Sequence, residues 1–197
     1  LTPTGRHDPG SLSIRSPERC GGLDVRTRRI PRGIAKEWGV VNACCLAPEM
    51  AANADGFGAL ADLAAARGLK ASVEYIPGMV IGNLPNTLEL LGQVNRSNAG
   101  LLIDAMHLYR SGATTADLAA VDPELILHAQ LCDVPMISAF ENYADEARFE
   151  RLAPGEGELP LADFVKALPR HITVGVEVPM RAATESGISA EDRLRPV

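Results

Sequence analysis

Apolar residues along the chain fall into short runs, and the segments between them repeat with a helical period. Four runs end in or near a polar residue, and they occupy residues 69–75, 99–104, 125–133 and 172–179. A fifth apolar run lies near residues 40–46. Short apolar runs bounded by turn residues are typical of buried strands. Strands that alternate with helices predict parallel βα units.

The segments between the runs predict four helices and one long loop. In residues 85–94, Leu88, Leu91 and Val94 repeat on one helical face. We expect the other helices from Asp55 to Ala66, after a cap at Thr114 or Thr115, and over residues 161–168. Residues 134–157 are expected to form a loop, and loops of that length are usually functional or mobile.

The predicted fold is an α/β (β/α)8 TIM barrel that is incomplete at its N-terminus. A closed barrel of this type has eight βα units over roughly 250 residues, and this chain has 197 residues and about five recognisable units. An open doubly wound sheet is the alternative, but no glycine-rich dinucleotide loop follows any predicted strand. We expect residues 1–33, rich in Arg, Gly, Ser and Pro, to be poorly ordered, and residues 34–197 to form the partial barrel.

Four polar side chains lie at or near the carboxyl ends of the predicted strands. They are Glu74, Asp104, Gln130 and Glu177. Taken singly, each has an ordinary explanation, such as a solvent-facing strand end, a loop cap or a satisfied core amide. Parallel α/β folds, however, bring the carboxyl ends of their strands to one edge, where active sites form. Together, the four residues therefore predict one shared site.

The charge of this predicted site favours a metal ion. Three carboxylates in apolar surroundings are costly unless cations or hydrogen bonds compensate them. Within the four runs, Lys70 is the one lysine or arginine, so a divalent ion is the simplest compensating charge. Oxygen ligands favour Mn²⁺ or Mg²⁺, and a histidine ligand would admit Co²⁺ or Zn²⁺.

Further polar residues follow the same strands. His107 stands three residues after Asp104, where it could bind metal or a substrate oxygen, although lone histidines are more often structural. Arg151 precedes a Pro-Gly-Glu-Gly turn and could clamp a substrate, or it could be a solvated surface arginine. His128, two residues before Gln130, is expected to lie deeper in the barrel as a packing residue.

Composition and charge argue against nucleic acid and membranes as binding partners. The formal net charge of -6 gives no electrostatic footprint for nucleic acid. No apolar stretch approaches the roughly 20 residues that span a bilayer. The four cysteines form no CxxC pair, which is typical of reduced thiols in a cytoplasmic protein. We therefore expect a cytoplasmic protein that acts on a small molecule and can form a homo-oligomer through its open sheet.

Five segments of the chain resemble the sugar phosphate isomerase/epimerase family of xylose isomerase-like TIM barrels. They read VEYIPG, LLIDAMHLYRSG, LHAQLCD, RLAPGEGELPL and VGVEVP, and the resemblance covers roughly residues 40–185. It implies that Glu74, Asp104, Gln130 and Glu177 ligate a metal, and that His107 and Arg151 contact substrate. Many members of the family carry histidine at the position of Gln130, and glutamine there resembles the hydroxypyruvate isomerase branch.

The resemblance also implies a reaction. A divalent ion would chelate adjacent substrate oxygens and stabilise an enediolate, while Glu74 and Glu177 remove and return a proton. The expected activity is a metal-dependent sugar or sugar phosphate isomerase or epimerase. The alternatives are hydroxypyruvate isomerisation, dehydration of an inosose or a dehydroshikimate-like acid, and an inactive truncated barrel. A trinuclear zinc endonuclease is disfavoured, since this chain has four histidines.

Overall fold

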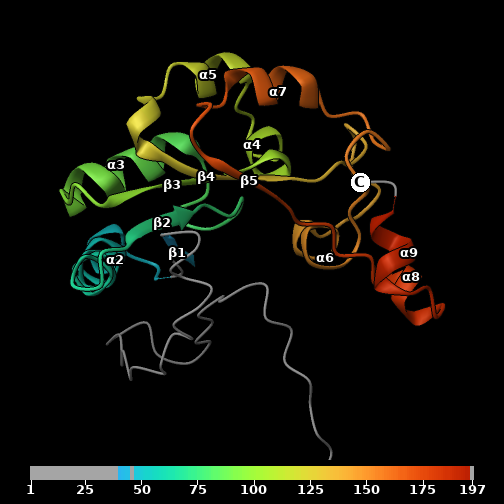
Figure 1. Cartoon of the computed structure of the whole chain (residues 1–197), viewed down its shortest axis with the longest axis horizontal. Coiled ribbons are helices and arrows are strands. Elements are labelled where there is room, and N and C mark those ends of the chain that lie inside the picture. Colours follow the sequence, from blue (N-terminus) through green and yellow to red (C-terminus); the bar gives the residue numbers. More distant parts are fainter. Residues whose placement is uncertain (1–39, 45–46, 196–197) are drawn as a thin grey trace, which may run out of the picture.

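The computed structural model describes residues 40–44 and 47–195, which form one parallel sheet with flanking helices (Figure 1). The five strands pair in chain order, β1-β2-β3-β4-β5, and every pairing is parallel. Their bounds are β1 Val40–Cys44, β2 Lys70–Glu74, β3 Ala99–Asp104, β4 Ile126–Leu131 and β5 Thr173–Val176. This confirms the predicted α/β architecture with its five parallel units.

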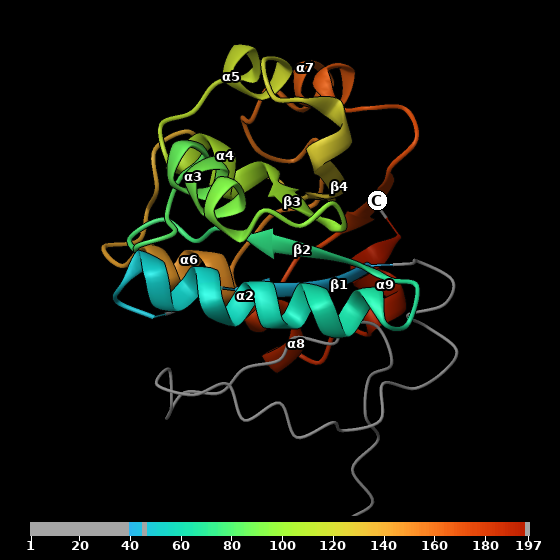
Figure 2. The same cartoon turned by 90° about the vertical axis from the view of Figure 1, so that its left-hand side faces the viewer.

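Helices follow each strand and differ in length. The longer ones are α2 Met50–Ala65 and α3 Leu84–Val94, and the shorter ones are α4 Ala105–Arg110, α5 Thr115–Ala119, α6 Tyr143–Phe149, α7 Leu161–Ala167, α8 Arg181–Glu185 and α9 Ala190–Leu194, with the 3-10 helix η1 at Pro123–Leu125. In Figure 1, α2, α3, α5 and α7 lie around the outside of the arc of strands, and α6, α8 and α9 gather at its other side. Figure 2 shows α2 running along the sheet beside β1 and β2.

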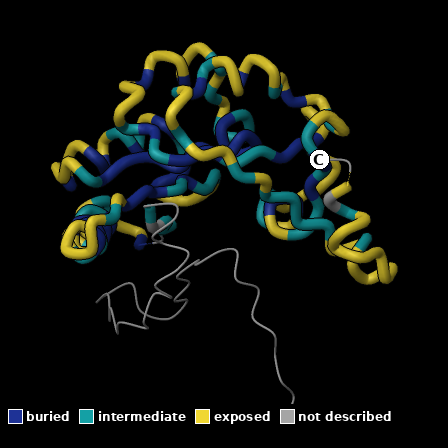
Figure 3. Tube along the Cα trace, in the orientation of Figure 1, coloured by how far each residue is buried: buried dark blue, intermediate teal, exposed yellow. Residues whose placement is uncertain are grey.

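The core lies between the sheet and the outer helices. Val73, Leu101 and Ile103 project from one face of β2 and β3, and they are fully buried in one cluster with Phe57 of α2 and Leu90 of α3. Figure 3 shows this as buried segments along the central strands and exposed segments on the helices, with α8 and α9 mostly exposed. Burial of this apolar face fixes which side chains point to the opposite face of the sheet.

Strand register sets the height of the polar side chains on that opposite face. Asp104 of β3 pairs with Gln130 of β4, and Leu102 pairs with both Glu74 of β2 and His128 of β4. A register irregularity between Leu101 and Leu102 shifts β3 relative to β4. Asp104 and Gln130 therefore share a level at the carboxyl edge, and His128 lies one level deeper, at the level of Glu74.

Two expectations about helices were wrong. Helix α2 begins at Met50, five residues before the expected start at Asp55, because the side chain of Asn53 bonds to both the N–H and the carbonyl of Ala47 at 2.9 Å and secures this first turn. The expected loop at residues 134–157 contains α6, whose first turn is capped by Asn142. That cap and the two acidic residues after it are a helix-start signature.

The expected boundary between residues 33 and 34 lies outside the described residues, as does the expected disorder of residues 1–33. Within residues 40–44 and 47–195, none of the helices combines the length and the apolar character needed to span a bilayer.

Candidate metal centre and active site

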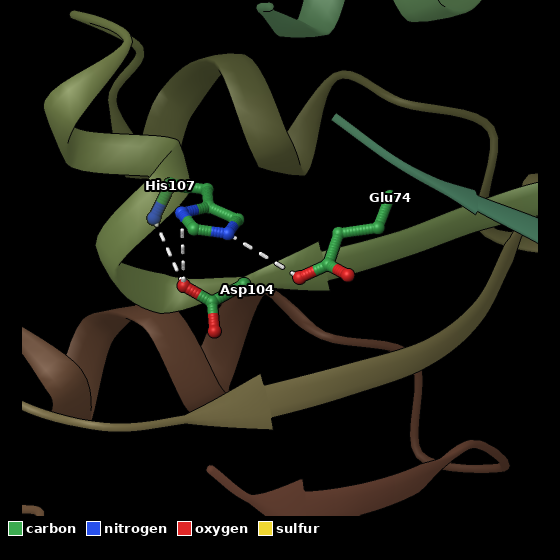
Figure 4. A group of neighbouring side chains, drawn as sticks. All are labelled: Glu74, Asp104 and His107. Atoms are coloured by element: carbon green, nitrogen blue, oxygen red, sulfur yellow. Dashed lines mark hydrogen bonds and ion pairs between the residues drawn. The ribbon is translucent and has the colours of Figure 1, made fainter. Parts of the chain in front are cut away.

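The carboxyl edge of β2 and β3 brings three ligand-type side chains together. Glu74 ends β2, Asp104 ends β3, and His107 lies in the first turn of α4 (Figure 4). One ligand atom from each lies within 4.8 Å of the others, which makes them a candidate metal-binding group in the described part of the chain. His107 Nε2 is 3.3 Å from Glu74 Oε1, and His107 Nδ1 is 3.7 Å from Asp104 Oδ1.

Asp104 has a structural role as well as a place in the site. Its Oδ1 accepts the backbone N–H of His107 at 2.9 Å and so caps α4. Its Oδ2 accepts a hydrogen bond from Arg151 Nη1 at 2.8 Å. The Asp104 side chain has no exposed surface. One carboxylate thus fixes both the helix that carries His107 and the guanidinium of Arg151.

Arg151 is buried, and its side chain points into the cluster. Its Nε donates to the carbonyl of Ala147 at 2.9 Å, and its Nη1 contacts Asp104, Cys132 Sγ at 3.4 Å and Glu177 Oε2 at 3.6 Å. The guanidinium therefore supplies part of the positive charge that the apolar runs themselves lack. Because these contacts hold Arg151 against Asp104 and Glu177, its first function in this structure is to hold the carboxylates in place.

A turn secured by Asp133 places Arg151 beside the strand ends. Asp133 forms an antiparallel bridge with Leu152, the residue after Arg151. Its buried carboxylate accepts the backbone N–H groups of Val134, Leu159 and Gly155 at 2.9–3.0 Å. Asp133 thus closes the Pro-Gly-Glu-Gly turn that the sequence analysis singled out beside Arg151.

Gln130 and Glu177 lie at the same edge but outside the group of three. Gln130 Oε1 is buried and has no hydrogen-bond partner within residues 40–44 and 47–195. Glu177, directly after β5, keeps 45% of its side chain exposed and meets the site through Arg151. A buried amide oxygen without a partner is unusual and needs a ligand, an ion or water to satisfy it.

The donor set fits a divalent cation. Carboxylate oxygens, an amide oxygen and an imidazole nitrogen suit Mg²⁺ or Mn²⁺, and the imidazole also suits Zn²⁺ or Co²⁺. The orphaned oxygen of Gln130 is the observation that favours an ion here, because the described residues offer it no donor. Of these residues, Glu74, Asp104 and His107 already offer ligand atoms within 4.8 Å of one another.

The charges of the cluster shift the pKa of its members. Burial disfavours the ionised carboxyl of Asp104, but Arg151 and His107 outweigh it and lower its pKa. Burial alone would lower the pKa of His107, but the carboxylates of Asp104 and Glu74 raise it. Partial burial, with Glu74 and Asp104 nearby, raises the pKa of Glu177 against the opposing charge of Arg151. A carboxyl with a raised pKa holds its proton more readily, as a general acid requires.

Sequence reasoning missed two residues that contact this site. The hydroxyl of Tyr143 hydrogen-bonds His107 Nδ1, and Glu146 binds Arg110 on the helix that carries His107. Both belong to α6, which was expected to be loop. The helix-start signature at Asn142 would have indicated the helix, but no pattern in the sequence predicts that it packs against α4.

Comparison with known proteins places this geometry in a family. Residues 15–194 match the family model described as xylose isomerase-like TIM barrel. An inosose isomerase from Bacillus subtilis is 27% identical over 111 residues, which are 55% of this chain and 38% of the relative. The chain thus spans well under half the length of this curated relative in the aligned region.

Two solved structures share the fold. The IolI protein, described with a bound zinc atom, superposes with a TM-score of 0.67 at 21% identity over 85% of this chain and 68% of its own. A probable 3-DHS dehydratase, AsbF from Bacillus anthracis, gives a TM-score of 0.60 at 19% identity over 71% of this chain and 57% of its own. Because the family model matches residues 15–194, which are most of this chain, the chain belongs to the xylose isomerase-like TIM barrel family.

Proposed function

We propose that the protein is a divalent-metal-dependent isomerase or epimerase of a small carbohydrate. The observation that carries this proposal is the convergence of Glu74, Asp104 and His107 at the carboxyl edge of the sheet. The same edge holds the buried, unpartnered oxygen of Gln130. The similar inosose isomerase and the zinc-bound IolI protein support a proton-transfer reaction on a polyhydroxy carbonyl compound.

In this proposal, Glu74, Asp104, Gln130 and Glu177 hold the metal. When bound, the ion supplies Lewis-acid stabilisation of the negative charge that develops on substrate oxygens. Mn²⁺ or Mg²⁺ suits the oxygen-rich donor set, and Zn²⁺ or Co²⁺ is the alternative if His107 ligates. Asp104 is the fixed member of the set, because its hydrogen bonds to His107 and Arg151 lock its carboxylate.

Glu74 and Glu177 are the proposed acid and base. Glu74 ends β2 and Glu177 directly follows β5, and β3 and β4 lie between these two strands. One carboxylate removes a proton from a carbon beside the carbonyl, and the other, in its protonated form, delivers a proton. In epimerisation this proton goes to the opposite face of the same carbon. In isomerisation it goes to the former carbonyl carbon, and the hydroxyl proton moves to the former carbonyl oxygen. The raised pKa of Glu177 suits a group that must hold a proton in one half of the cycle.

His107 and Arg151 orient the reacting groups. The imidazole of His107, 3.3 Å from Glu74, polarises a substrate oxygen that enters beside that carboxylate. Arg151 keeps Asp104 and Glu177 in place, and its part in substrate binding is restricted to the guanidinium nitrogen that these contacts leave over. The dehydratase alternative uses the same carboxylates to expel water from the same type of carbanion, and it is favoured by the likeness to AsbF.

A Mn²⁺-loaded sample assayed by mass spectrometry and NMR in ²H₂O tests this proposal. The substrates are an inosose, several ketoses, hydroxypyruvate and 3-dehydroshikimate. Isomerisation gives a product of unchanged formula that incorporates solvent deuterium, and dehydration gives a product lighter by one water. Glu177→Gln should lower turnover by about 10²–10⁴-fold, the usual contribution of a general acid or base, and Glu74→Gln should also weaken Mn²⁺ binding.

Glu89→Gln is the matched control, because Glu89 is exposed on α3 and bonds only Gln93 among the described contacts. It should leave turnover and Mn²⁺ affinity unchanged. Absence of both metal binding and turnover in the wild-type chain would contradict the proposal and indicate an inactive partial barrel. Equal Mn²⁺ affinity in wild type and Glu74→Gln would refute the ligand assignment alone.

A further inference from the structure

Helices α4 and α6 are joined by two side-chain pairs that face the site. His107 of α4 meets Tyr143 of α6, and Arg110 of α4 meets Glu146 of α6. In each helix the two partners are three residues apart, so both pairs lie along one face of each helix. We call this arrangement the α4–α6 clasp.

The Arg110–Glu146 pair secures α6 independently of the tyrosine. Glu146 is buried, and its two carboxylate oxygens accept from Arg110 Nε at 3.1 Å and Nη2 at 2.9 Å. The same guanidinium donates to the carbonyls of Pro135 at 2.6 Å and Met136 at 2.8 Å. Nearly every N–H group of the Arg110 guanidinium thus has an acceptor, and the two parallel bonds to Glu146 hold the two side chains in one relative orientation. Tyr143 is therefore presented to His107 by an anchored helix.

The hydroxyl of Tyr143 is the hydrogen-bond partner of His107 Nδ1. The other polar atom near His107 Nδ1 is Asp104 Oδ1 at 3.7 Å, beyond hydrogen-bond length. That oxygen already accepts the backbone N–H of His107, and the second carboxylate oxygen accepts from Arg151. The Tyr143 ring is tilted by 54° to the imidazole at 5.8 Å between centroids, so the contact is made through the hydroxyl.

Helix α6 also contacts Arg151, the cationic side chain that binds Asp104. The carbonyl of Ala147 accepts from Arg151 Nε at 2.9 Å. Tyr143, Glu146 and Ala147 are related as i, i+3 and i+4, so they share one face of α6. This face contacts His107, Arg110 and Arg151, and through them it reaches both Glu74 and Asp104.

We propose that Tyr143 is a positioning residue, whose hydroxyl donates to His107 Nδ1 and keeps the proton on Nε2, directed at Glu74. In a neutral imidazole, one nitrogen donates and the other accepts, so a donor at Nδ1 selects the Nε2–H form. His107 then donates through its single Nε2–H, to Glu74 in this structure or to a substrate oxygen that takes the place of that carboxylate oxygen, and Nε2 does not ligate the metal. This deepens the proposed function, on whose site it rests, by separating His107 from the ligand set.

The experiment is ¹⁵N–¹H correlation NMR of His107 in the full, metal-free chain, labelled at histidine, with Tyr143→Phe beside wild type over a pH series that extends above the raised pKa of His107, where the imidazole is neutral. The wild-type spectrum should place the proton on Nε2, with Nδ1 in its unprotonated range. Tyr143→Phe, which keeps the ring, should give a mixture of the two tautomers. An unchanged His107 signature in Tyr143→Phe would overturn the proposal, and so would a wild-type proton on Nδ1.

Tyr109→Phe is the matched control. Tyr109 lies on α4 like His107, and its hydroxyl also has a side-chain partner, Thr115 Oγ1 at 2.9 Å. The same substitution there should leave the His107 signature as in wild type. Arg110→Lys keeps the charge but loses the bidentate fork, and it should produce the same tautomer mixture with Tyr143 intact. An unaltered signature in Arg110→Lys would contradict the anchoring part of the clasp.

Mn²⁺ titration calorimetry gives a second readout. Partners that orient a metal site typically change affinity by about 10–100-fold, so Tyr143→Phe should weaken Mn²⁺ binding by about 10-fold through Glu74, and Tyr109→Phe should not. Equal affinity in Tyr143→Phe and wild type would count against the positioning role. If the wild type shows the Nε2–H signature but turns over none of the substrates, the proposed function fails and the clasp stands.

Discussion

The buried amide of Gln130 is expected to lower the stability of the metal-free fold and to strengthen metal binding. Its Oε1 is buried without a partner in the described part of the chain, and such an atom costs about 1–3 kcal/mol. Gln130→Met keeps the length of the side chain and removes the orphaned acceptor. We therefore expect the metal-free variant to unfold at higher urea, with a free energy of unfolding raised by about 1 kcal/mol, and to bind Mn²⁺ more weakly than wild type.

Gln93→Met controls for the change of residue type, because Gln93 is exposed on α3 and its amide donates to Glu89 at 3.2 Å. Both its unfolding and its Mn²⁺ affinity should match wild type. A Gln130→Met protein that is less stable than wild type, with the same affinity for Mn²⁺, would show that the amide is satisfied within the fold and is no ligand.

At this scale, the sequence predicted the polar residues at the strand ends and His107, and it missed Tyr143 and Glu146 of α6. Strand periodicity and the carboxyl-edge rule were sufficient to predict that Glu74, Asp104 and Gln130 lie at one edge of the sheet. The pairing of Arg151 with Asp104 was not predictable, because it depends on how a turn folds back 47 residues later. Tyr143 was missed because its partner lies on another element.

The turn after Arg151 depends on a glycine for space. A Cβ on Gly157 would lie 2.4 Å from Asp133 Oδ1 and 2.7 Å from the nitrogen of Val134, and Asp133 is held by three backbone hydrogen bonds. Because the carboxylate cannot move without losing these bonds, Gly157→Ala should lower the free energy of unfolding by about 2 kcal/mol, as overpacking typically does. Urea unfolding followed by circular dichroism measures this change.

Gly92→Ala is the same substitution without the clash. Gly92 is exposed within α3, and a Cβ there meets nothing within 4 Å. Alanine is the better helix former, so this variant should gain about 0.5–1 kcal/mol. Equal effects of the two substitutions would mean that the close approach of Gly157 to Asp133 does not constrain the turn.

Elements with a strong internal period were predicted well, and those defined by tertiary contacts were not. Helix α3 was expected over residues 85–94 and spans Leu84–Val94, because its apolar stripe and its Asn83 cap act locally. Helix α4 follows β3 without a connecting loop, since Asp104 ends the strand and caps the helix at once. No apolar stripe of its own marks α4, so its existence follows from that cap and from its burial.

At the scale of the whole molecule, the described strands form an arc of five, whereas the barrel of the family has eight. The repeating βα rhythm predicted the parallel order correctly, because consecutive strands joined by helical connections usually lie side by side. The same argument predicted that five units cannot close. Closure depends on the number of strands, so no individual residue indicates which strands would complete the barrel.

The open edges lead us to expect that the isolated chain self-associates. Among the described strands, β1 pairs only with β2 and β5 only with β4, and Val174 and Val176 of β5 are 42% and 46% exposed. An apolar, unpaired edge strand is a template for another chain, and a charge on it blocks that pairing. Sedimentation velocity at rising concentration should detect dimers or larger species, and Val176→Lys should shift the distribution toward monomer.

Ile137→Lys separates edge pairing from general apolar attraction. Ile137 is 86% exposed, more than either valine, but it lies in the segment before α6 and belongs to no strand. If the chains associate by pairing at the edge of the sheet, Ile137→Lys should sediment like wild type, and Val176→Lys should sediment mainly as monomer. Dispersal by Ile137→Lys alone would assign the contact to the loop beside the site, and a wild type that stays monomeric at every concentration would contradict the expectation altogether.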